Sequence, residues 1–328
     1  MSIRRRLLDY ASNAVTPIAD GFNRVDKKAL PSHGAVDVIV VKQSNGQFFS
    51  TTTVLQLGRL QSSVGTVKII IGGREVHTEV PLELDEFGKA IFQRSHPDRE
   101  LYTMRLKSSE WSNANLTPGQ NQGIFKLQNN IEVEFNVFLF HQDDRLILSD
   151  IDGTITNSDL LGHGAGAIGV SYNHDGVVNL FNAIRTNGYQ IVYLSARPVA
   201  LASSTRRYLR TSGLPDGPVL CSDKGAMTAV FTELGGKVGF SGLTNLKMKI
   251  IRSITEQFDV QANVVHGAYG NRETDYQAYS SAGISLDKIW IINKQSVLQH
   301  IQSGKKFLDG YVHQLHRLDD FFPRLSKY

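Results

Sequence analysis

The chain is poor in cysteine and in long apolar runs, and each shortage narrows what it can be. Its 328 residues include one cysteine, Cys221, which excludes an internal disulfide framework and a cysteine-based zinc site. This scarcity fits a reducing compartment. No run of 18 apolar residues is present, so we expect no segment that spans a bilayer. The net charge of +4 is too weak to predict a nucleic-acid partner. We therefore expect a cytoplasmic protein that binds no nucleic acid.

Residues 1–24 carry an apolar stripe that predicts an amphipathic helix. Its arginines stand together at the start, so the helix suits a membrane interface with anionic headgroups. The alternative is a helix whose stripe packs on the protein's own core. The residues expected to contact a membrane are Ile3, Arg4, Arg5, Arg6, Leu7, Leu8 and Ala11.

Residues 25–144 alternate between apolar and polar side chains, which predicts β structure. Asn45-Gly46 lies between two apolar stretches and is the strongest short hairpin signal in the chain. Several short strands between regularly spaced turns favour an immunoglobulin-like β-sandwich. Strands are expected at 35–42, 48–57, 67–71, 76–82 and 131–139, and the polar residues 107–122 are expected to form a surface loop.

Residues 145–328 change to a pattern of strands alternating with helices, which predicts an α/β domain with a parallel sheet covered by helices on both faces. Strands are expected at 146–149, 189–194, 219–221, 263–266 and 288–292. Helices are expected at 176–186, 199–211, 243–258 and 273–282. The amphipathic stretch 307–322 is expected to pack back on this domain.

Two aspartates end the first of these strands. The apolar run 146–149 stops at Asp150 and Asp152, and Gly153 lets the chain turn there because it has no Cβ. Both carboxylates then gather at the carboxyl edge of the sheet, where open α/β sheets bind their ligands. Two such groups repel each other unless a cation lies between them, and oxygen ligands suit Mg²⁺. This pattern favours a metal-dependent phosphoryl-transfer enzyme.

Later strands supply partners for these aspartates. Ser195 follows the second strand, where its hydroxyl is placed to hold a phosphoryl oxygen. The helix 243–258 carries Lys247 and Lys249, either of which could offset the charge of phosphate and aspartate. Asn271 and Asp275 follow the fourth strand, where further metal ligands are expected.

Together these residues resemble the four motifs of the haloacid dehalogenase superfamily. More closely, residues 149–163 are similar to the catalytic domain of lipins, which are Mg²⁺-dependent phosphatidate phosphatases, and residues 268–275 and 318–325 are also lipin-like. Residues 36–46 and the N-terminal segment resemble the lipin N-terminal region. The resemblance implies a Rossmann-like haloacid dehalogenase domain that follows the N-terminal helix and the sandwich in the sequence.

For the chemistry, the resemblance implies a nucleophile and an acid–base pair. Asp150 would attack the phosphate and form an aspartyl-phosphate. Asp152 would protonate the departing diacylglycerol oxygen and then deprotonate the hydrolytic water. Ser195 would bind phosphoryl oxygens, and Thr154 would orient the loop.

For the metal, the resemblance implies Mg²⁺ held by the Asp150 carboxylate, the Asp152 backbone carbonyl and Asn271. Asp275 would lie in this ligand shell or next to it. As the active-site lysine we prefer Lys249, because the Lys-Ile-Ile sequence matches the family pattern better than Lys247 does.

The long linker that separates the two conserved regions of animal lipins is missing here. We therefore expect the strands before Asp150 to complete the sandwich begun at Ala35, giving one compact two-domain enzyme.

The resemblance makes phosphatidic acid in membranes the expected substrate and makes the protein peripheral, on the endoplasmic reticulum or the nuclear envelope. One alternative is a phosphatase for a soluble phosphate ester or a phosphoprotein. Another is a non-catalytic phosphatidate-binding module for lipid transfer or sensing, although retention of both Asp150 and Asp152 opposes it. The sequence sets no oligomeric state.

Overall fold

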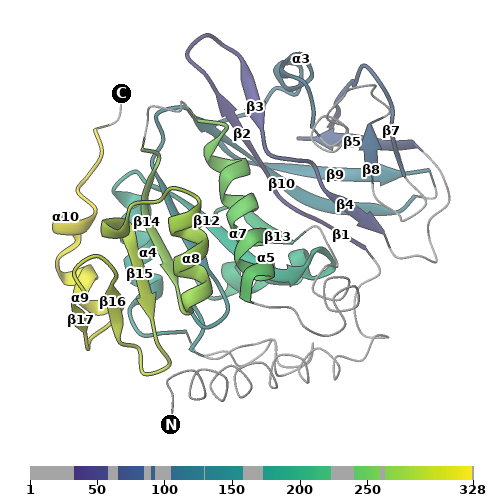
Figure 1. Cartoon of the computed structure of the whole chain (residues 1–328). Helices are drawn as coiled ribbons and strands as arrows, with labels where there is room; N and C mark the ends of the chain where they lie inside the picture. Colours follow the sequence, from purple (N-terminus) through teal and green to yellow (C-terminus); the bar gives the residue numbers. More distant parts are fainter. Residues whose placement is uncertain are drawn as a thin grey trace, which may run out of the picture.

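The structure is a computed structural model that describes residues 33–57, 66–84, 90–92, 105–128, 130–157, 173–222, 240–258 and 263–326. The amphipathic segment 1–24 lies outside these residues, so its helix stays a prediction. Figure 1 shows two lobes, an N-terminal β lobe and a larger lobe in which helices cover a sheet.

The β lobe contains one eight-stranded sheet and one two-stranded sheet. The large sheet runs β3-β2-β10-β9-β5-β7-β8, with β6 paired to β5, and β1 pairs with β4. Their apolar faces share a core in which Phe125 and Phe135 stack 4.1 Å apart between ring centroids. The strands are β1 (His33–Ala35), β2 (Val38–Lys42), β3 (Phe48–Ser50), β4 (Leu55–Leu57), β5 (Thr66–Ile71), β6 (Arg74–Glu75), β7 (Leu82–Leu84), β8 (Ala90–Phe92), β9 (Gly119–Leu127) and β10 (Glu132–His141).

The hairpin at Asn45-Gly46 is confirmed, since β2 and β3 pair across it and Gly46 has φ +84°. The immunoglobulin-like class stays a prediction. The expected strand 48–57 is instead two strands in different sheets, and the expected strand 76–82 is wrong, because β6 ends at Glu75 and β7 begins at Leu82.

The expected surface loop 107–122 is also wrong. Helix α3 (Ser108–Ser112) begins here, capped by Glu110, whose carboxylate accepts the Lys107 backbone N–H at 2.6 Å, and it buries Trp111. Strand β9 then begins at Gly119 with a polar sequence, whose backbone pairs with β10 on one side, and residues 123–127 of the same strand also pair with β5. Tertiary pairing overrides the low β propensity of Asn, Gln and Gly.

The second lobe is a seven-stranded sheet in the order β13-β12-β11-β14-β15-β16-β17. Its first five strands are parallel and match the expected strands, which confirms the parallel sheet, whereas the antiparallel β16 and β17 were not expected. The strands are β11 (Leu146–Asp150), β12 (Gln190–Pro198), β13 (Val219–Ser222), β14 (Val265–Gly270), β15 (Ile289–Ile292), β16 (Leu298–His300) and β17 (Lys306–Phe307).

The four expected helices are also confirmed, and helices α7 and α8 pack together in front of the sheet in Figure 1. The C-terminal stretch packs back as expected, since Phe322 is buried against Tyr189 and Tyr269. The helices are α4 (Val177–Thr186), α5 (Ala202–Thr211), α7 (Phe240–Thr255), α8 (Glu273–Ser281), α9 (Tyr311–His316) and α10 (Leu318–Phe321), with short 3₁₀ turns η4 (Val199–Leu201) and η5 (Leu286–Lys288).

The two lobes pack directly against each other. Strand β10, which leads directly into β11, pairs in parallel with β2 from the N-terminal region, so these two strands share one sheet, while the sandwich stays a prediction. Residues of β2 and β10 also join the core of the second lobe, including Ile39 and Phe138. The boundary between 25–144 and 145–328 remains a prediction.

A fully buried aspartate fastens the lobes together. Asp37 precedes β2 and accepts hydrogen bonds from the backbone N–H groups of Asn136 and Val219, at 2.8 and 2.9 Å. Arg206 on α5 pairs with the same carboxylate at 3.1 Å and also donates to two backbone carbonyls of the β lobe. Nearby, Gly34 in β1 packs so tightly on η4 that an added Cβ would lie 2.2 Å from the Val199 carbonyl oxygen.

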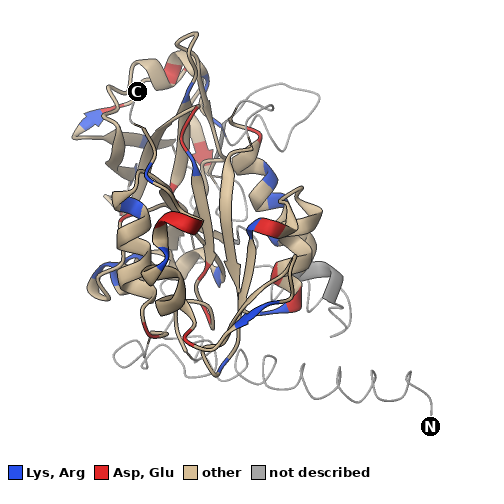
Figure 2. Cartoon of the chain, turned by 90° about the vertical axis from the view of Figure 1, so that its left-hand side faces the viewer, with Lys and Arg blue, Asp and Glu red and all other residues tan. Residues whose placement is uncertain are grey.

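Charges of both signs are interspersed over the described chain, as Figure 2 shows. Among the described residues, no helix is long and apolar enough to cross a membrane.

We predict that Asp37→Ala lowers the free energy of unfolding by about 3 to 5 kcal/mol, because it removes the carboxylate from the largely buried Arg206 and leaves two backbone N–H groups without their acceptor. Urea denaturation measures this loss. The matched control is Glu75→Ala, which removes an exposed ion pair with Lys68 and should cost less than about 1 kcal/mol. Similar losses in the two variants would contradict a fastening role for Asp37.

Candidate active site

The candidate active site lies at the carboxyl end of β11, the strand that pairs with β12 on one side and β14 on the other. All five residues of β11 are buried, which suits an apolar strand at the centre of a parallel sheet. The chain then turns at Gly153, whose φ of +82° favours glycine. This turn brings Asp150 and Asp152 to the same cleft.

Asp150 is buried and faces a lysine. The Lys247 ammonium donates to its Oδ1 at 2.7 Å, and the Thr154 hydroxyl donates to its Oδ2 at 3.2 Å. Burial raises the pKa of Asp150 to about 7, since it outweighs the opposing effect of Lys247. The negative charge of Asp275 adds to this rise in pKa. Burial and Asp275 therefore oppose the negative charge of Asp150, and Lys247 favours it.

The lysine at this site is Lys247, which corrects the preference for Lys249. Lys247 bridges Asp150 and Asp275, whereas the Lys249 side chain is exposed two positions further along α7. Burial alone would lower the pKa of Lys247, but the two carboxylates outweigh it and raise the pKa above its usual value. Residues two positions apart on a helix point about 200° away from each other around its axis, so only one of these lysines can face the sheet.

Asp275 organises the loop after β14. Its Oδ2 accepts the backbone N–H groups of Asn271 and Arg272, each at 3.0 Å, while its Oδ1 faces Lys247. An added Cβ at Gly270 would lie 2.4 Å from the Asp275 Cβ, so the glycine makes room for this carboxylate. The structure therefore brings Asp275 to the site with its oxygens already bonded, and it leaves Asn271 at the cleft wall.

Asp152 is held by a residue absent from the expected site. Arg197 donates to both oxygens of the Asp152 carboxylate, from Nε at 3.0 Å and from a terminal nitrogen at 2.6 Å. The guanidinium also donates to the Thr205 hydroxyl at 3.0 Å, and both partners of the pair are buried. Arg197 lies two residues after Ser195, so the sequence Leu-Ser-Ala-Arg could have indicated that this arginine lies near the site.

Ser195 reaches the same cleft from the neighbouring strand. Its hydroxyl oxygen accepts the Arg197 backbone N–H at 3.2 Å. Tyr311 on α9 holds the backbone of the loop after β11, because its hydroxyl donates to the Thr154 carbonyl at 2.9 Å. Cys221 pairs with Ser195 across the sheet, and burial raises the pKa of its thiol to about 12, so it stays protonated.

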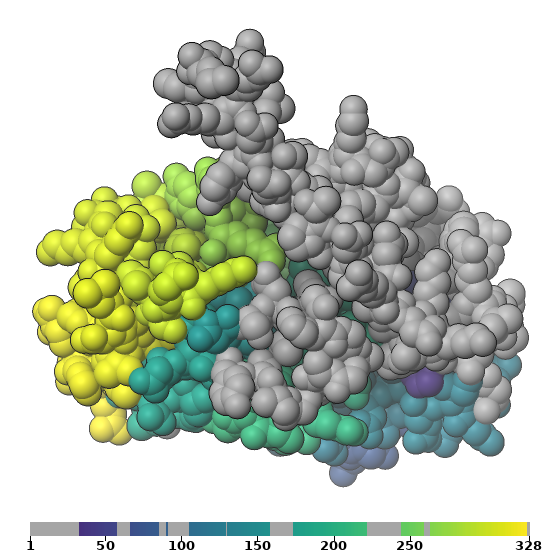
Figure 3. Space-filling view, turned by 90° about the horizontal axis from the view of Figure 1, so that it is seen from below, coloured from purple at the N-terminus to yellow at the C-terminus, as the bar shows by residue number. Residues whose placement is uncertain are grey.

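The cleft combines charged groups with an apolar wall. Leu246 and Ile250 from α7 and Leu194 from β12 line it beside the charged residues. In Figure 3, the view from below, yellow C-terminal atoms lie at the surface beside green and teal atoms of the catalytic lobe.

The donor set suits a hard cation. Among the described residues, no three His, Cys, Asp or Glu side chains are already gathered as a metal centre. The oxygen-bearing residues that line the cleft include Asp150, Asp152, Asn271 and Asp275. A site with few protein oxygens fits Mg²⁺, which keeps several waters and also binds substrate phosphate.

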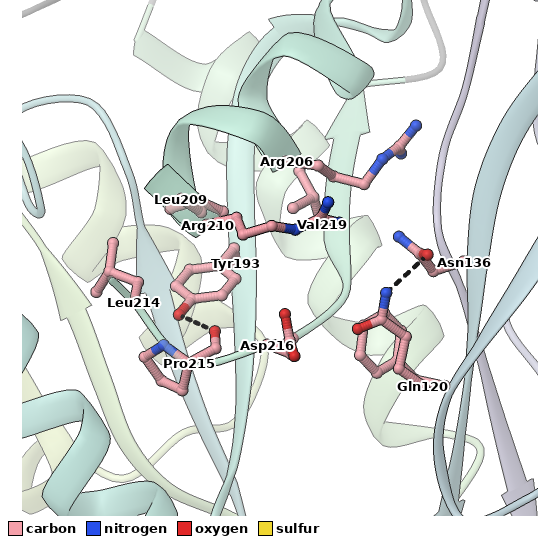
Figure 4. A pocket seen from close by; sticks show the side chains of 12 residues that line it. Gln120, Asn136, Tyr193, Arg206, Leu209, Arg210, Leu214, Pro215, Asp216 and Val219 are labelled. Atoms are coloured by element: carbon pink, nitrogen blue, oxygen red, sulfur yellow. Dashed lines mark hydrogen bonds between the residues drawn. The ribbon is translucent and has the colours of Figure 1, made fainter. Parts of the chain in front are cut away.

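A second pocket lies between the lobes, away from these residues. Figure 4 shows Gln120 and Asn136 of the β lobe facing Tyr193 and Arg210 of the catalytic lobe. Gln120 donates to Asn136 at 2.9 Å, and the Tyr193 hydroxyl donates to the Pro215 carbonyl at 2.8 Å. The first bond lies within the β lobe and the second within the other lobe, so neither of them crosses the junction.

Two family models match the chain. LNS2 (Lipin/Ned1/Smp2) matches residues 102–323, and the lipin N-terminal conserved region matches residues 8–110. The chain is 32% identical over 234 residues to the human phosphatidate phosphatase LPIN1, covering 69% of this chain and 26% of the relative. It is 36% identical over 236 residues to nuclear elongation and deformation protein 1 of Schizosaccharomyces pombe, covering 68% and 35%. It is 34% identical over 241 residues to phosphatidic acid phosphohydrolase 1 of Saccharomyces cerevisiae, covering 70% and 28%.

The matched part thus spans about a quarter to a third of these curated relatives. Among solved structures, the chain is similar to a cobalt-bound deoxy-D-mannose-octulosonate 8-phosphate phosphatase from Haemophilus influenzae, at 18% identity, covering 43% of this chain and 67% of that one. Its TM-score of 0.28 is too low to support an inference.

We predict that Mg²⁺ raises the melting temperature of the chain. A cation that binds only the folded state stabilises it by about 2.7 kcal/mol at a hundred times its dissociation constant. Asn271→Ala should shrink this rise in thermal denaturation, because it removes one oxygen donor. Asp143→Asn, at an exposed carboxylate in the turn after β10, is the control and should leave the rise unchanged. A rise unaffected by Asn271→Ala would place the cation elsewhere.

Proposed function

Because the chain belongs to the lipin family, we propose that it hydrolyses phosphatidate to diacylglycerol and phosphate, with Asp150 as the nucleophile. The observation that carries the proposal is the contact of Asp150 with Lys247 at the carboxyl end of the central strand. This position gives a buried carboxylate an adjacent cation and an open cleft. Curated relatives named phosphatidate phosphatases support the choice of substrate.

In the first step, an Asp150 oxygen attacks phosphorus and the bond to the glycerol oxygen breaks. The product is an aspartyl-phosphate, and Asp152 gives its proton to the departing diacylglycerol oxygen. In the second step, Asp152 takes a proton from water, whose oxygen attacks the same phosphorus. Free phosphate leaves, and the Asp150 carboxylate is restored.

Arg197 gives this cycle a physical constraint. Arg197 donates two hydrogen bonds to the Asp152 carboxylate, the group that accepts a proton in the proposed second step. In the proposed first step, Asp152 carries that proton on one of its two oxygens. A protonated carboxyl oxygen is a weaker hydrogen-bond acceptor than a carboxylate oxygen, so the bond from Arg197 to that oxygen weakens in this step.

The remaining groups bind and orient the phosphate. Lys247 offsets the charge on Asp150 and the phosphoryl group, and Ser195 is placed at the cleft to hold a phosphoryl oxygen. Thr154 fixes the Asp150 side chain through its hydroxyl. Bound Mg²⁺ would supply positive charge that neutralises the phosphate and draws it toward Asp150. The Asp150 carboxylate, the Asp152 carbonyl and Asn271 would hold it, while Asp275 positions the Asn271 loop.

Membrane association completes the proposal. The segment 1–24 would lie in the interface through Ile3, Leu7, Leu8 and the neighbouring arginines, so that the protein is peripheral on the endoplasmic reticulum or the nuclear envelope. These residues lie outside the described part of the chain, and their role rests on their amphipathic pattern alone.

We predict that Asp150→Asn abolishes phosphate release from phosphatidate vesicles in Mg²⁺, because an amide is not a nucleophile toward phosphorus. The melting temperature shows whether the variant is folded. Asp143→Asn should keep full activity. Activity retained in Asp150→Asn would refute the assignment. An equal rate of the unaltered chain on soluble short-chain esters and on vesicles would favour a soluble-ester phosphatase instead.

We predict that Lys247→Met lowers kcat by at least about a hundredfold, since it removes the cation that faces Asp150. Lys249→Met is the matched control, because the exposed Lys249 lies on the same helix and its loss should change kcat less than about twofold. Steady-state kinetics on detergent-dispersed phosphatidate compares the two variants. A larger loss from Lys249→Met would restore the original sequence-based preference.

A further inference from the structure

We propose that the turn Phe307–Gly310 inserts Leu308 into the lipid surface and so forms a membrane contact separate from residues 1–24. The proposal rests on the proposed function, because it takes the carboxyl edge of the catalytic sheet to face a bilayer. Leu308 is 79% exposed. The other exposed large hydrophobic side chains among the described residues are Phe49 and Leu286, at 45% and 38%.

Strand register places Leu308 at the catalytic edge. Asp150 is level with Gly270, because Ser149 pairs with Tyr269, and Gly270 pairs with Ile291. Across the next two strands, Ile291 pairs with Gln299, which pairs with Lys306.

Lys306 is therefore level with Asp150, and Leu308 lies beyond that level. Strand β17 runs parallel to β15, since each is antiparallel to β16, so the turn after β17 leaves from the edge where Asp150 lies. The lateral separation is four strand spacings, about 19 Å. Figure 3 shows the yellow C-terminal atoms at the surface of the lower face.

The turn that carries Leu308 is held firmly. Gly310 donates its backbone N–H to the Phe307 carbonyl at 3.1 Å, which closes the turn with Leu308 at its tip. Phe307 is half-buried and stacks on His313, with ring centroids 4.3 Å apart. An added Cβ at Gly310 would lie 2.4 Å from the Ser296 carbonyl oxygen, so the turn packs directly on the neighbouring β15–β16 turn.

The residue that follows this turn also contacts the loop after β11. Tyr311 follows Gly310 at once, and its hydroxyl donates to the Thr154 carbonyl at 2.9 Å. Because these contacts hold the turn in place, the exposure of Leu308 is not that of a mobile loop. A rigid apolar tip is suited to insertion into a lipid surface. Its depth relative to Asp150 is fixed by the fold.

The charges around the tip identify the kind of surface. Lys306 at the start of this turn and Lys294 in the neighbouring β15–β16 turn are exposed, against one exposed carboxylate, Asp309. An apolar tip surrounded by excess positive charge fits a lipid surface rich in anionic headgroups. Phosphatidate itself supplies such headgroups.

The test separates lipid binding from chemistry. Leu308→Ser should weaken flotation with phosphatidylcholine vesicles containing phosphatidate, measured in EDTA, by about tenfold. Its activity on vesicles in Mg²⁺ should fall similarly, while activity on soluble short-chain phosphatidate stays unchanged. Leu308→Trp should retain or strengthen flotation, because an indole also suits the interface. Lys306→Gln should weaken flotation by about fivefold on these anionic vesicles and leave binding to pure phosphatidylcholine unchanged.

The matched control is Leu286→Ser. Leu286 lies in η5, before β15, at the opposite edge of the sheet, and its replacement should change neither flotation nor activity. Equal flotation of Leu308→Ser and the unaltered chain would overturn the proposal. A change in sedimentation mass in Leu308→Ser, with flotation unchanged, would also overturn it by assigning the turn to a second copy of the chain. If flotation depends on Leu308 but the chain hydrolyses no phosphatidate, the proposed function is refuted and the membrane contact at Leu308 is not.

Discussion

The repulsion among three buried carboxylates at one sheet edge is the constraint on which the site depends. Asp150, Asp152 and Asp275 are all less than one tenth exposed, so water screens their charges poorly. Two cations resolve the conflict in different ways. Lys247 bridges Asp150 and Asp275, and Arg197 binds Asp152 alone. In the proposed mechanism, this division separates the carboxylate that attacks phosphorus from the one that transfers the proton.

The β lobe stabilises this arrangement from outside the sheet. Gly34 packs against η4, the turn that directly follows the strand carrying Ser195 and Arg197. Asp37 binds the backbone of β13 and the side chain of Arg206 on α5, the helix that follows η4. The N-terminal region therefore contacts the catalytic lobe next to the segment that sets the position of Arg197. This contact gives a physical reason for the pairing of β10, the strand that leads into β11, with β2 from the N-terminal region.

Periodicity predicted the catalytic lobe closely and the β lobe less well. A parallel strand is apolar throughout and each helix has its own period, so the strand containing Asp150 and the helix containing Lys247 could be found locally. Strand β9 could not, because its polar start is stabilised by backbone pairing with β10, a neighbour that the local sequence does not reveal. The choice between Lys247 and Lys249 failed because it relied on matching neighbouring letters rather than on which helix face meets the sheet. Arg197 was visible in the sequence, but its bonds to Asp152 depend on the approach of two strands.

The register of one sheet sets both the level of the proposed nucleophile and the level of the proposed membrane contact. The phosphate of a phospholipid lies at headgroup level, so a nucleophile must reach that level while an apolar side chain goes deeper. Strand register provides this difference, because Phe307 lies one residue, about 3 Å, beyond the level of Asp150, and Leu308 lies further still. Interfacial apolar groups bury about 5–10 Å into the headgroup boundary. Tyr311 connects the two functions through its bond to Thr154, so that the sheet edge which positions the nucleophile also sets its height above the lipid.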